Sequence, residues 1–125
     1  MQIHRNAQLP AAELPGITHT TLAGHELGAR RLSVWRQSVA PGAATPPHRH
    51  DCEEVVLVEA GRGRLLVDGR AVEFGPDSTL VLPAGCDHQI INDGDEPLQL
   101  VAAFSATPVG TFTPEGAAID LPWRS

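Results

Sequence analysis

The sequence predicts an all-β fold whose antiparallel strands close into a barrel or a double-sheet sandwich. Twelve glycines and eleven prolines interrupt the 125 residues at short intervals, and few windows between them show helical periodicity. Helix breakers at this frequency leave room mainly for short strands and turns. Closure is expected because it removes exposed sheet edges.

Seven or eight short antiparallel strands are expected between residues 30 and 106. They occupy residues 30–39, 53–61, 63–74, 78–85, 88–92 and 97–106. The run 63–74 contains two strands, because Asp68-Gly69 is a strong signal for a two-residue hairpin turn. The last two runs are expected to pair with each other around the turn at residues 93–96.

The chain is expected to form a single domain, because 125 residues suffice for one packed core. Residues 1–29 are the least patterned part and predict an N-terminal arm with one or two short strands. Residues 30–106 are the expected core of the barrel, and residues 107–125 return to loop composition as a C-terminal tail. Leu121 and Trp123 in this tail are expected to cover apolar surface on the barrel or on a neighbour.

Composition and charge argue against several classes of partner. The formal net charge is −6 and the acidic residues are spread out, which disfavours nucleic acid because phosphate neutralisation needs a basic face. The basic run at residues 61–70 favours a hairpin with exposed arginines over a phosphate loop. No stretch approaches the ~20 apolar residues of a membrane helix, and no signal peptide is evident, so a cytoplasmic location is expected. Cys52 and Cys86 are then expected as thiols.

One stretch, residues 46–55, holds two histidines one residue apart. Pro46 and Pro47 disfavour a helix, so His48 and His50 are expected on a strand or at its end. Side chains at positions i and i+2 of a strand share a face about 6.6 Å apart. Two imidazoles placed in this way can converge on one ion.

Two further residues can complete such a site. Glu54 follows a turn expected at residues 51–53 and could offer a carboxylate from the next strand. His88 opens a strand just after the Pro-x-Gly turn at residues 83–85. Imidazole and carboxylate ligands suit divalent zinc, iron, nickel, copper or manganese. The alternatives are a solvated surface pair of histidines and a turn-capping role for His88.

The spacing of these residues resembles the two sequence motifs of the cupin superfamily. The intervals of the first motif are matched by Gly42, His48, His50, Glu54 and Gly61. Those of the second are matched by Pro83, Gly85, His88 and Asn92. The sequence departs from the second motif at one position. The family has a glycine six residues before the proline that corresponds to Pro83, and this residue is Asp77 here. The departure concerns the shape of a loop and not the metal ligands. The resemblance covers residues 30–106.

The resemblance implies a small double-stranded β-helix, or jelly-roll barrel, with one divalent transition metal ion (Fe, Mn, Ni, Cu or Zn) inside its mouth. The ligands carried over are His48, His50, Glu54 and His88. Asn92 would position the barrel rather than bind the metal. His4, His19 and His25 match neither motif, and surface roles are expected for all three. Members of the family commonly form homodimers, and the arm and tail lie outside the barrel core. The resemblance therefore implies a homodimer formed by exchange of terminal strands.

Strand alternation predicts which side chains line the pocket. Ile90 shares the face of His88. On the final strand, the alternate positions Leu100, Ala102 and Phe104 carry the bulkier side chains and are assigned to the inside of the barrel. Small cupins place substrate-contacting residues on the strand at residues 30–39. The expected pocket residues are Trp35, Gln37, Ile90, Leu100, Ala102 and Phe104. The alternative for Trp35 is that it only fills the core.

The ligand set also limits the chemistry. Three neutral histidines and one glutamate around a divalent cation leave a net positive charge, and an octahedral site keeps positions open. A small-molecule substrate that is anionic or has adjacent oxygens would fit. The expected function is a metalloenzyme with dioxygenase-type oxidoreductase chemistry. The alternatives are a metal-dependent isomerase or lyase of a small carbonyl compound, and a non-catalytic protein that binds metal or a small molecule.

Overall fold

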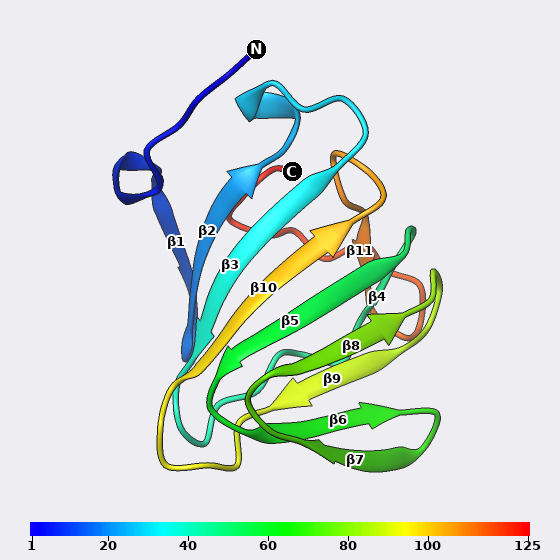
Figure 1. The fold of residues 1–125 in the computed structure, drawn as a ribbon. Helices are drawn as coiled ribbons and strands as arrows, with labels where there is room; N and C mark the ends of the chain where they lie inside the picture. Colours follow the sequence, from blue (N-terminus) through cyan, green and yellow to red (C-terminus); the bar gives the residue numbers. More distant parts are fainter.

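The computed structural model describes residues 1–125 and confirms the all-β fold, with every strand pair antiparallel (Figure 1). The strands are β1 (Ala11–Leu14), β2 (Ile17–Ala23), β3 (Ser33–Val39), β4 (Arg49–His50), β5 (Glu54–Ala60), β6 (Gly63–Val67), β7 (Arg70–Phe74), β8 (Ser78–Leu82), β9 (His88–Ile91), β10 (Leu98–Phe104) and β11 (Thr111–Phe112). The helical segments are two single 3-10 turns, η1 (Asn6–Gln8) and η2 (His25–Leu27). Neither has the length or the apolar run that crossing a membrane requires.

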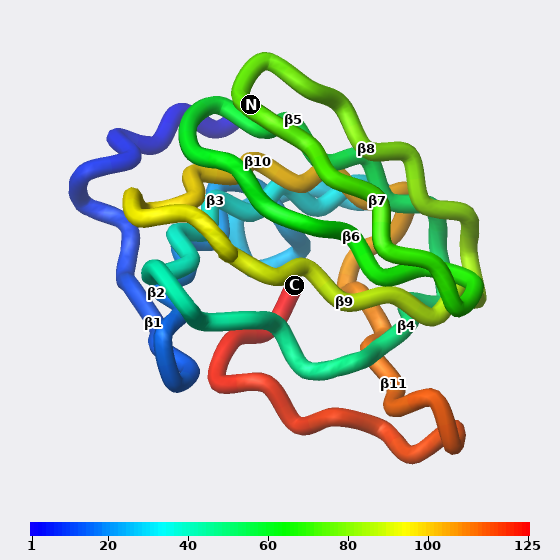
Figure 2. The backbone as a smooth tube through the Cα atoms, turned by 90° about the horizontal axis from the view of Figure 1, so that it is seen from below, coloured from blue at the N-terminus to red at the C-terminus, as the bar shows by residue number.

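The strands form two layers that face each other across the core. One layer is a six-stranded sheet in the order β1-β2-β3-β10-β5-β8, and the other contains the sheet β7-β6-β9. β4 pairs with β11, and the segment around β4 joins the second layer because His48 bridges His88 and Ala44 bridges Ile91. Figure 2 shows β10 and β5 on one side of the interior and β6 and β9 on the other. This is a jelly-roll arrangement.

Most of the expected strands are present. Eight strands, β3 to β10, lie between residues 30 and 106. The hairpin at Asp68-Gly69 is confirmed, because Val67 pairs with Arg70 and both turn residues have positive φ, 51° and 71°. Positive φ at both central residues is what the type I′ turn of a right-twisted hairpin requires.

The expected pairing of residues 88–92 with residues 97–106 is wrong. β9 pairs with β6, whereas β10 lies between β3 and β5 in the other sheet. The turn between them is therefore a crossing from one layer to the other. The Asn92 amide holds this crossing by donating to the carbonyls of Val39 and Glu96, both at 2.8 Å, so Asn92 has the positioning role expected of it. A turn signal alone does not distinguish a hairpin from such a crossing.

Asp77, where the sequence departs from the family pattern, takes a turn conformation that suits glycine. Asp77 has φ +60°, the left-handed conformation that glycine adopts most easily and that Asp tolerates better than most residues. Its backbone N–H donates to the Val58 carbonyl at 2.9 Å. A left-handed turn is thus formed here with an aspartate at the position of the family's glycine.

The core is built by alternation along the strands of both layers. Every second residue of β10 is buried, from Leu98 to Phe104, and β5 begins with the same alternation. Phe104, Leu98, Val39 and Val56 are among the largest side chains with almost no exposure. Inward-facing positions on the six-stranded sheet thereby fill the space above the three-stranded sheet.

The two terminal segments also pack on the barrel. β1 and β2 extend the six-stranded sheet beside β3. The C-terminal tail runs back from β11 toward the middle of the molecule (Figure 2), where the Trp123 ring packs edge-on against Trp35 at a centroid distance of 5.4 Å. The Trp35 indole N–H donates to Ser125 Oγ at 2.8 Å. Leu121 and Trp123 therefore cover apolar surface on the barrel of their own chain.

The surface role expected for His19 is wrong, whereas His4 and His25 are exposed as expected. His19 is 1% exposed because β2 alternates and turns it inward together with Ile17. Its Nδ1 accepts from the Gln37 amide at 3.1 Å, so its Nε2–H donates to Thr21 Oγ1 at 2.7 Å. Its ring stacks on Trp123, with centroids 3.6 Å apart.

We predict that His19 makes the fold sensitive to acid. Burial lowers the pKa of His19 from 6.5 to about 4, so between these values the unfolded chain takes up a proton that the folded chain does not. The free energy of unfolding therefore falls as the pH is lowered from 6.5 toward 4, and His19 contributes up to roughly 2 kcal/mol of that loss. Urea unfolding at a series of pH values should show a smaller loss for His19→Gln than for the parent. Equal losses would contradict the prediction.

Candidate metal centre

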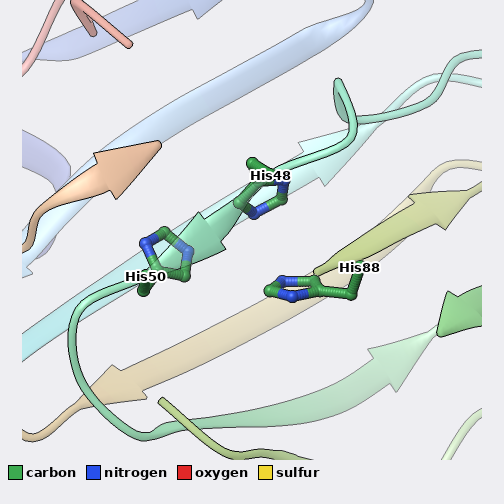
Figure 3. A group of neighbouring side chains, drawn as sticks. All are labelled: His48, His50 and His88. Carbon is green, nitrogen blue, oxygen red and sulfur yellow. The ribbon is translucent and has the colours of Figure 1, made fainter. Parts of the chain in front are cut away.

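The side chains of three histidines lie close together in the structure (Figure 3). His50 lies on β4, His48 immediately precedes that strand, and His88 opens β9. One ring nitrogen from each lies within 4.8 Å of those of the other two. The backbones of His48 and His88 exchange two hydrogen bonds, at 3.0 and 2.8 Å. This antiparallel bridge brings together two histidines that lie 40 residues apart in the sequence.

Each imidazole is oriented by a backbone carbonyl. The Nδ1 atoms of His48, His50 and His88 lie 2.6, 3.2 and 2.9 Å from the carbonyl oxygens of Pro46, Gly110 and Cys86. Because a carbonyl only accepts, each Nδ1 carries the proton and each Nε2 presents a lone pair. A second bond at Nδ1 that fixes the tautomer is typical of histidines that bind metals.

Glu54 brings a carboxylate to the same place. The turn at residues 51–53 separates β4 from β5, as expected, and Glu54 is the first residue of β5. Its Oε2 lies 3.4 Å from His50 Nε2 and 3.3 Å from His88 Nε2, and its side chain is 7% exposed.

The buried polar atoms of this cluster lack hydrogen-bond partners. Glu54 Oε2 and His88 Nε2 are both buried without one, which is costly for a carboxylate removed from water. A divalent cation among the four side chains would satisfy both atoms, and imidazole with carboxylate is a donor set that first-row transition metals accept. The residues present therefore fit the metal that the resemblance implies.

The electrostatics favour neutral histidines at two of the three positions. Burial lowers the pKa of His48 to about 4, and the His88 ring lowers it further. Burial also lowers the pKa of His50, against the opposing effect of Glu54. Burial also acts to lower the pKa of His88, but the neighbouring Glu54 carboxylate stabilises the protonated ring more strongly. The pKa of His88 is therefore raised. A bound cation would replace the positive charge that His88 otherwise offers to Glu54.

The turn before His88 is held against β4. The N–H of Gly85 donates to the carbonyl of His50 at 2.9 Å. Gly85 has φ +75°, a conformation that a side chain would strain. The glycine of the second motif thus fixes the position from which β9 starts.

A small cavity of about 50 Å³ adjoins the metal cluster. Trp35, Gln37 and Ile90, three of the residues that strand alternation assigns to a substrate pocket, line this cavity. Leu100, Ala102 and Phe104 also face inward but do not line it, because they lie in the packed core. The Phe104 ring packs between His50 and Trp35, with centroid distances of 4.9 and 4.3 Å.

Sequence reasoning missed the part of the wall that comes from the chain termini. The terminal segments contribute the apolar walls Leu14, Ile17, Ile119, Leu121 and Trp123. Thr111 lies 3.1 Å from His50 Nδ1 and also lines the cavity. No motif marks these positions, although a tryptophan in an otherwise loop-like tail was a signal that the tail covers apolar surface.

The two cysteines are free thiols, as expected. Cys52 belongs to the buried core, and Cys86 orients His88 only through its backbone carbonyl. Burial raises the pKa of both thiols.

Comparison with known proteins agrees with this geometry. Residues 35–104 match the family model described as "Cupin domain". The chain is 39% identical over 108 residues to auxin-binding protein 1 of Arabidopsis thaliana, covering 78% of this chain and 54% of that protein. It is 40% identical over 109 residues to auxin-binding protein T85 of Nicotiana tabacum, with coverages of 78% and 58%. The chain thus spans about half the length of the curated relatives it matches.

A solved structure extends the likeness to the fold. The polyketide cyclase RemF from Streptomyces resistomycificus superposes with a TM-score of 0.74 at 24% identity, covering 87% of this chain and 83% of that one. The family model covers more than half of the chain, and both motifs meet at one cluster of buried side chains. The chain therefore belongs to the cupin superfamily.

Proposed function

We propose that the protein holds one divalent transition metal ion with His48, His50, His88 and Glu54 and uses it to capture a small carboxylate. The observation that carries this proposal is the buried cluster itself, in which Glu54 Oε2 and His88 Nε2 have no other partner beside a cavity with largely apolar walls. When bound, the metal supplies a positive charge and open coordination positions for oxygen ligands.

Charge selects the class of ligand. Glu54 is the only acidic residue that lines the cavity, and no arginine lines it. Three neutral imidazoles, one carboxylate and a divalent cation leave one net positive charge, which a monoanion neutralises. The surrounding apolar walls exclude water and strengthen that attraction.

The walls favour an organic ligand with an apolar body. Trp35, Ile90, Leu121 and Trp123 all face the cavity, and aromatic rings offer large apolar contact areas. The cavity of about 50 Å³ is far smaller than the several hundred Å³ of an ordinary ligand site. Leu121 and Trp123 also border a second cavity of about 370 Å³, so a shift of the tail would join the two and make room. The relatives named auxin-binding proteins support binding of a small organic molecule.

Dioxygenase-type oxidation of the captured molecule is the second candidate. The same donor set accepts iron, copper or manganese, and the dry cavity would protect reactive species from water. Isomerase or lyase chemistry has less support, because the titratable side chains that line the cavity, His48, His50 and Glu54, are all among the four that would hold the metal. None of them is left to move a proton to or from a substrate. Oxygen uptake that depends on a bound carboxylate would favour oxidation over binding alone.

We predict that the four side chains hold about one equivalent of metal. Purified parent protein should contain it by mass spectrometry of the metal, whereas His88→Ala and Glu54→Gln should lose at least about tenfold in metal affinity, because a ligand is removed from each. His25→Ala and Glu53→Gln are the matched controls, since both positions are exposed. Full metal content in His88→Ala and Glu54→Gln would contradict the ligand assignment.

We also predict that a carboxylate is recognised through the metal. Isothermal titration of the zinc-loaded protein should show binding of phenylacetate and at least about tenfold weaker binding of its neutral amide, because only the anion offsets the net charge. Binding should vanish when the metal is chelated and return on reloading. Equal affinities for the acid and the amide would rule out capture of the carboxylate by the metal.

The tail is expected to contribute to affinity but not to metal content. Trp123→Ala removes an aromatic wall of the cavity, which should weaken phenylacetate binding by roughly 1–3 kcal/mol. The metal content should stay that of the parent, because the ring of Trp123 packs against His19 and Trp35 and against none of the three histidines that would hold the metal. Unchanged phenylacetate affinity in Trp123→Ala would show that the ligand does not reach the tail.

A further inference from the structure

The histidines of the candidate metal centre differ in where their orienting groups come from. The Nδ1 atoms of His48 and His88 face the carbonyl oxygens of Pro46 and Cys86 at 2.6 and 2.9 Å. Each of these carbonyls lies two residues before its histidine, so both rings are oriented by their own segment. The groups that face His50 Nδ1 lie in a distant part of the chain.

Both groups that face His50 come from the base of the C-terminal tail. They are the carbonyl oxygen of Gly110, at 3.2 Å from Nδ1, and Thr111 Oγ1, at 3.1 Å. β11 pairs with β4 so that Thr111 lies directly opposite His50, and directly opposed side chains lie on the same face of a strand pair. Thr111 and His50 are 7% and 4% exposed. The hydroxyl therefore meets the imidazole away from bulk water.

The Gly110 carbonyl is shared between two donors. It also accepts from the backbone N–H of Asp51, at 3.3 Å. The distances to both donors are long for N–H···O bonds, which are usually about 2.9–3.0 Å. The Gly110 N–H donates in turn to Asp51 Oδ1 at 2.9 Å, which holds the base of the tail beside β4. Thr111 Oγ1 is the acceptor at His50 Nδ1 that no second donor shares.

We propose that Thr111 is a positioning residue of the metal centre, which holds His50 Nε2 toward the ion by accepting a hydrogen bond from Nδ1–H. This inference rests on the metal site of the proposed function. Rotation of an imidazole about its bond to Cβ has only a broad two-fold preference, and a flipped ring would turn Cε1 toward the ion. Phe104 and Trp35 pack on the ring at centroid distances of 4.9 and 5.9 Å. Apolar packing is similar for both orientations, whereas a hydrogen bond at Nδ1 favours one of them.

This role separates the base of the tail from its end. The Trp123 ring packs against His19 and Trp35 and serves as a wall of the cavity. Thr111 instead lies against the side chain of His50, which would bind the metal. Metal affinity is therefore expected to depend on residue 111 and not on residue 123.

Zinc affinity, measured by competition with a chelator, tests the proposal. Thr111→Val removes the hydroxyl but keeps the branched shape, and it should weaken zinc binding at least about tenfold, because a metal-binding histidine loses its hydrogen-bond partner. Thr111→Ser keeps the hydroxyl and should bind zinc within about threefold of the parent. The matched control is Thr113→Val in the same segment, where the hydroxyl accepts from the Ala117 N–H at 3.1 Å. Thr113→Val should bind zinc like the parent.

Nuclear magnetic resonance of the cobalt-loaded protein gives a readout that overall stability does not change. High-spin cobalt shifts the exchangeable N–H protons of bound imidazoles far from other resonances, and one such proton is expected for each of the histidines. The resonance of His50 should change in Thr111→Val, while those of His48 and His88 stay in place. All should match the parent in Thr111→Ser and Thr113→Val.

Folding of the variants is checked by far-ultraviolet circular dichroism of the metal-free proteins. A measurement on the parent avoids substitution altogether. In the zinc-loaded parent, the Nδ1–H proton of His50 should show a nuclear Overhauser effect to the side-chain protons of Thr111. Absence of this effect, or a proton on Nε2 of His50, would overturn the proposal.

The variants separate this inference from the proposed function. Parent-like zinc affinity in Thr111→Val would overturn the role of Thr111 and leave the metal site standing. Equal losses in Thr111→Val and Thr111→Ser would also overturn it, because the cause would then be packing rather than the hydroxyl. A parent that binds no zinc would overturn both the inference and the proposed function.

Discussion

The short antiparallel bridge between His48 and His88 is the constraint on which the site depends. It consists of two backbone hydrogen bonds, at 3.0 and 2.8 Å, and it joins the proline-rich segment before β4 to the start of β9. Without it, the histidines of the two motifs would lie on separate parts of one layer. With it, three imidazoles meet Glu54, which the opposite layer supplies from the first position of β5. The centre is thus held from both layers of the barrel.

Some buried polar atoms of this centre lack hydrogen-bond partners, and a bound metal ion would supply them. The Nδ1 atom of each of the three histidines has a backbone carbonyl as its hydrogen-bond partner. Glu54 Oε2 and His88 Nε2 have no hydrogen-bond partner. Burial also lowers the pKa of His48 and His50, which keeps their lone pairs available near neutral pH. Such a cluster is costly when empty and favourable when a cation is present, because the same atoms that lack partners become ligands.

The two faces of the six-stranded sheet serve different purposes. Its inner face provides Trp35 and Gln37 to the cavity and Phe104 to the core beneath His50. Its outer face carries exposed apolar side chains such as Leu57 and Val81. Period-two alternation produces both from the same strands, since Trp35 faces the cavity and its neighbours Val34 and Arg36 face outward. The inner face thereby lines the cavity beside the candidate metal centre.

The sequence by itself determined the local features of this protein. Turn residues such as Asp68-Gly69 and the breakers between the runs defined the short strands, and motif spacing singled out His48, His50, Glu54 and His88. Only the tertiary structure decided that β9 pairs with β6 rather than β10, that His19 is buried under Trp123, and that the tail closes the cavity. Turn chemistry and metal-ligand spacing act over a few residues, so they are visible in the sequence. Strand partners and tail packing are chosen by contacts between distant segments, which depend on how two whole layers fit together.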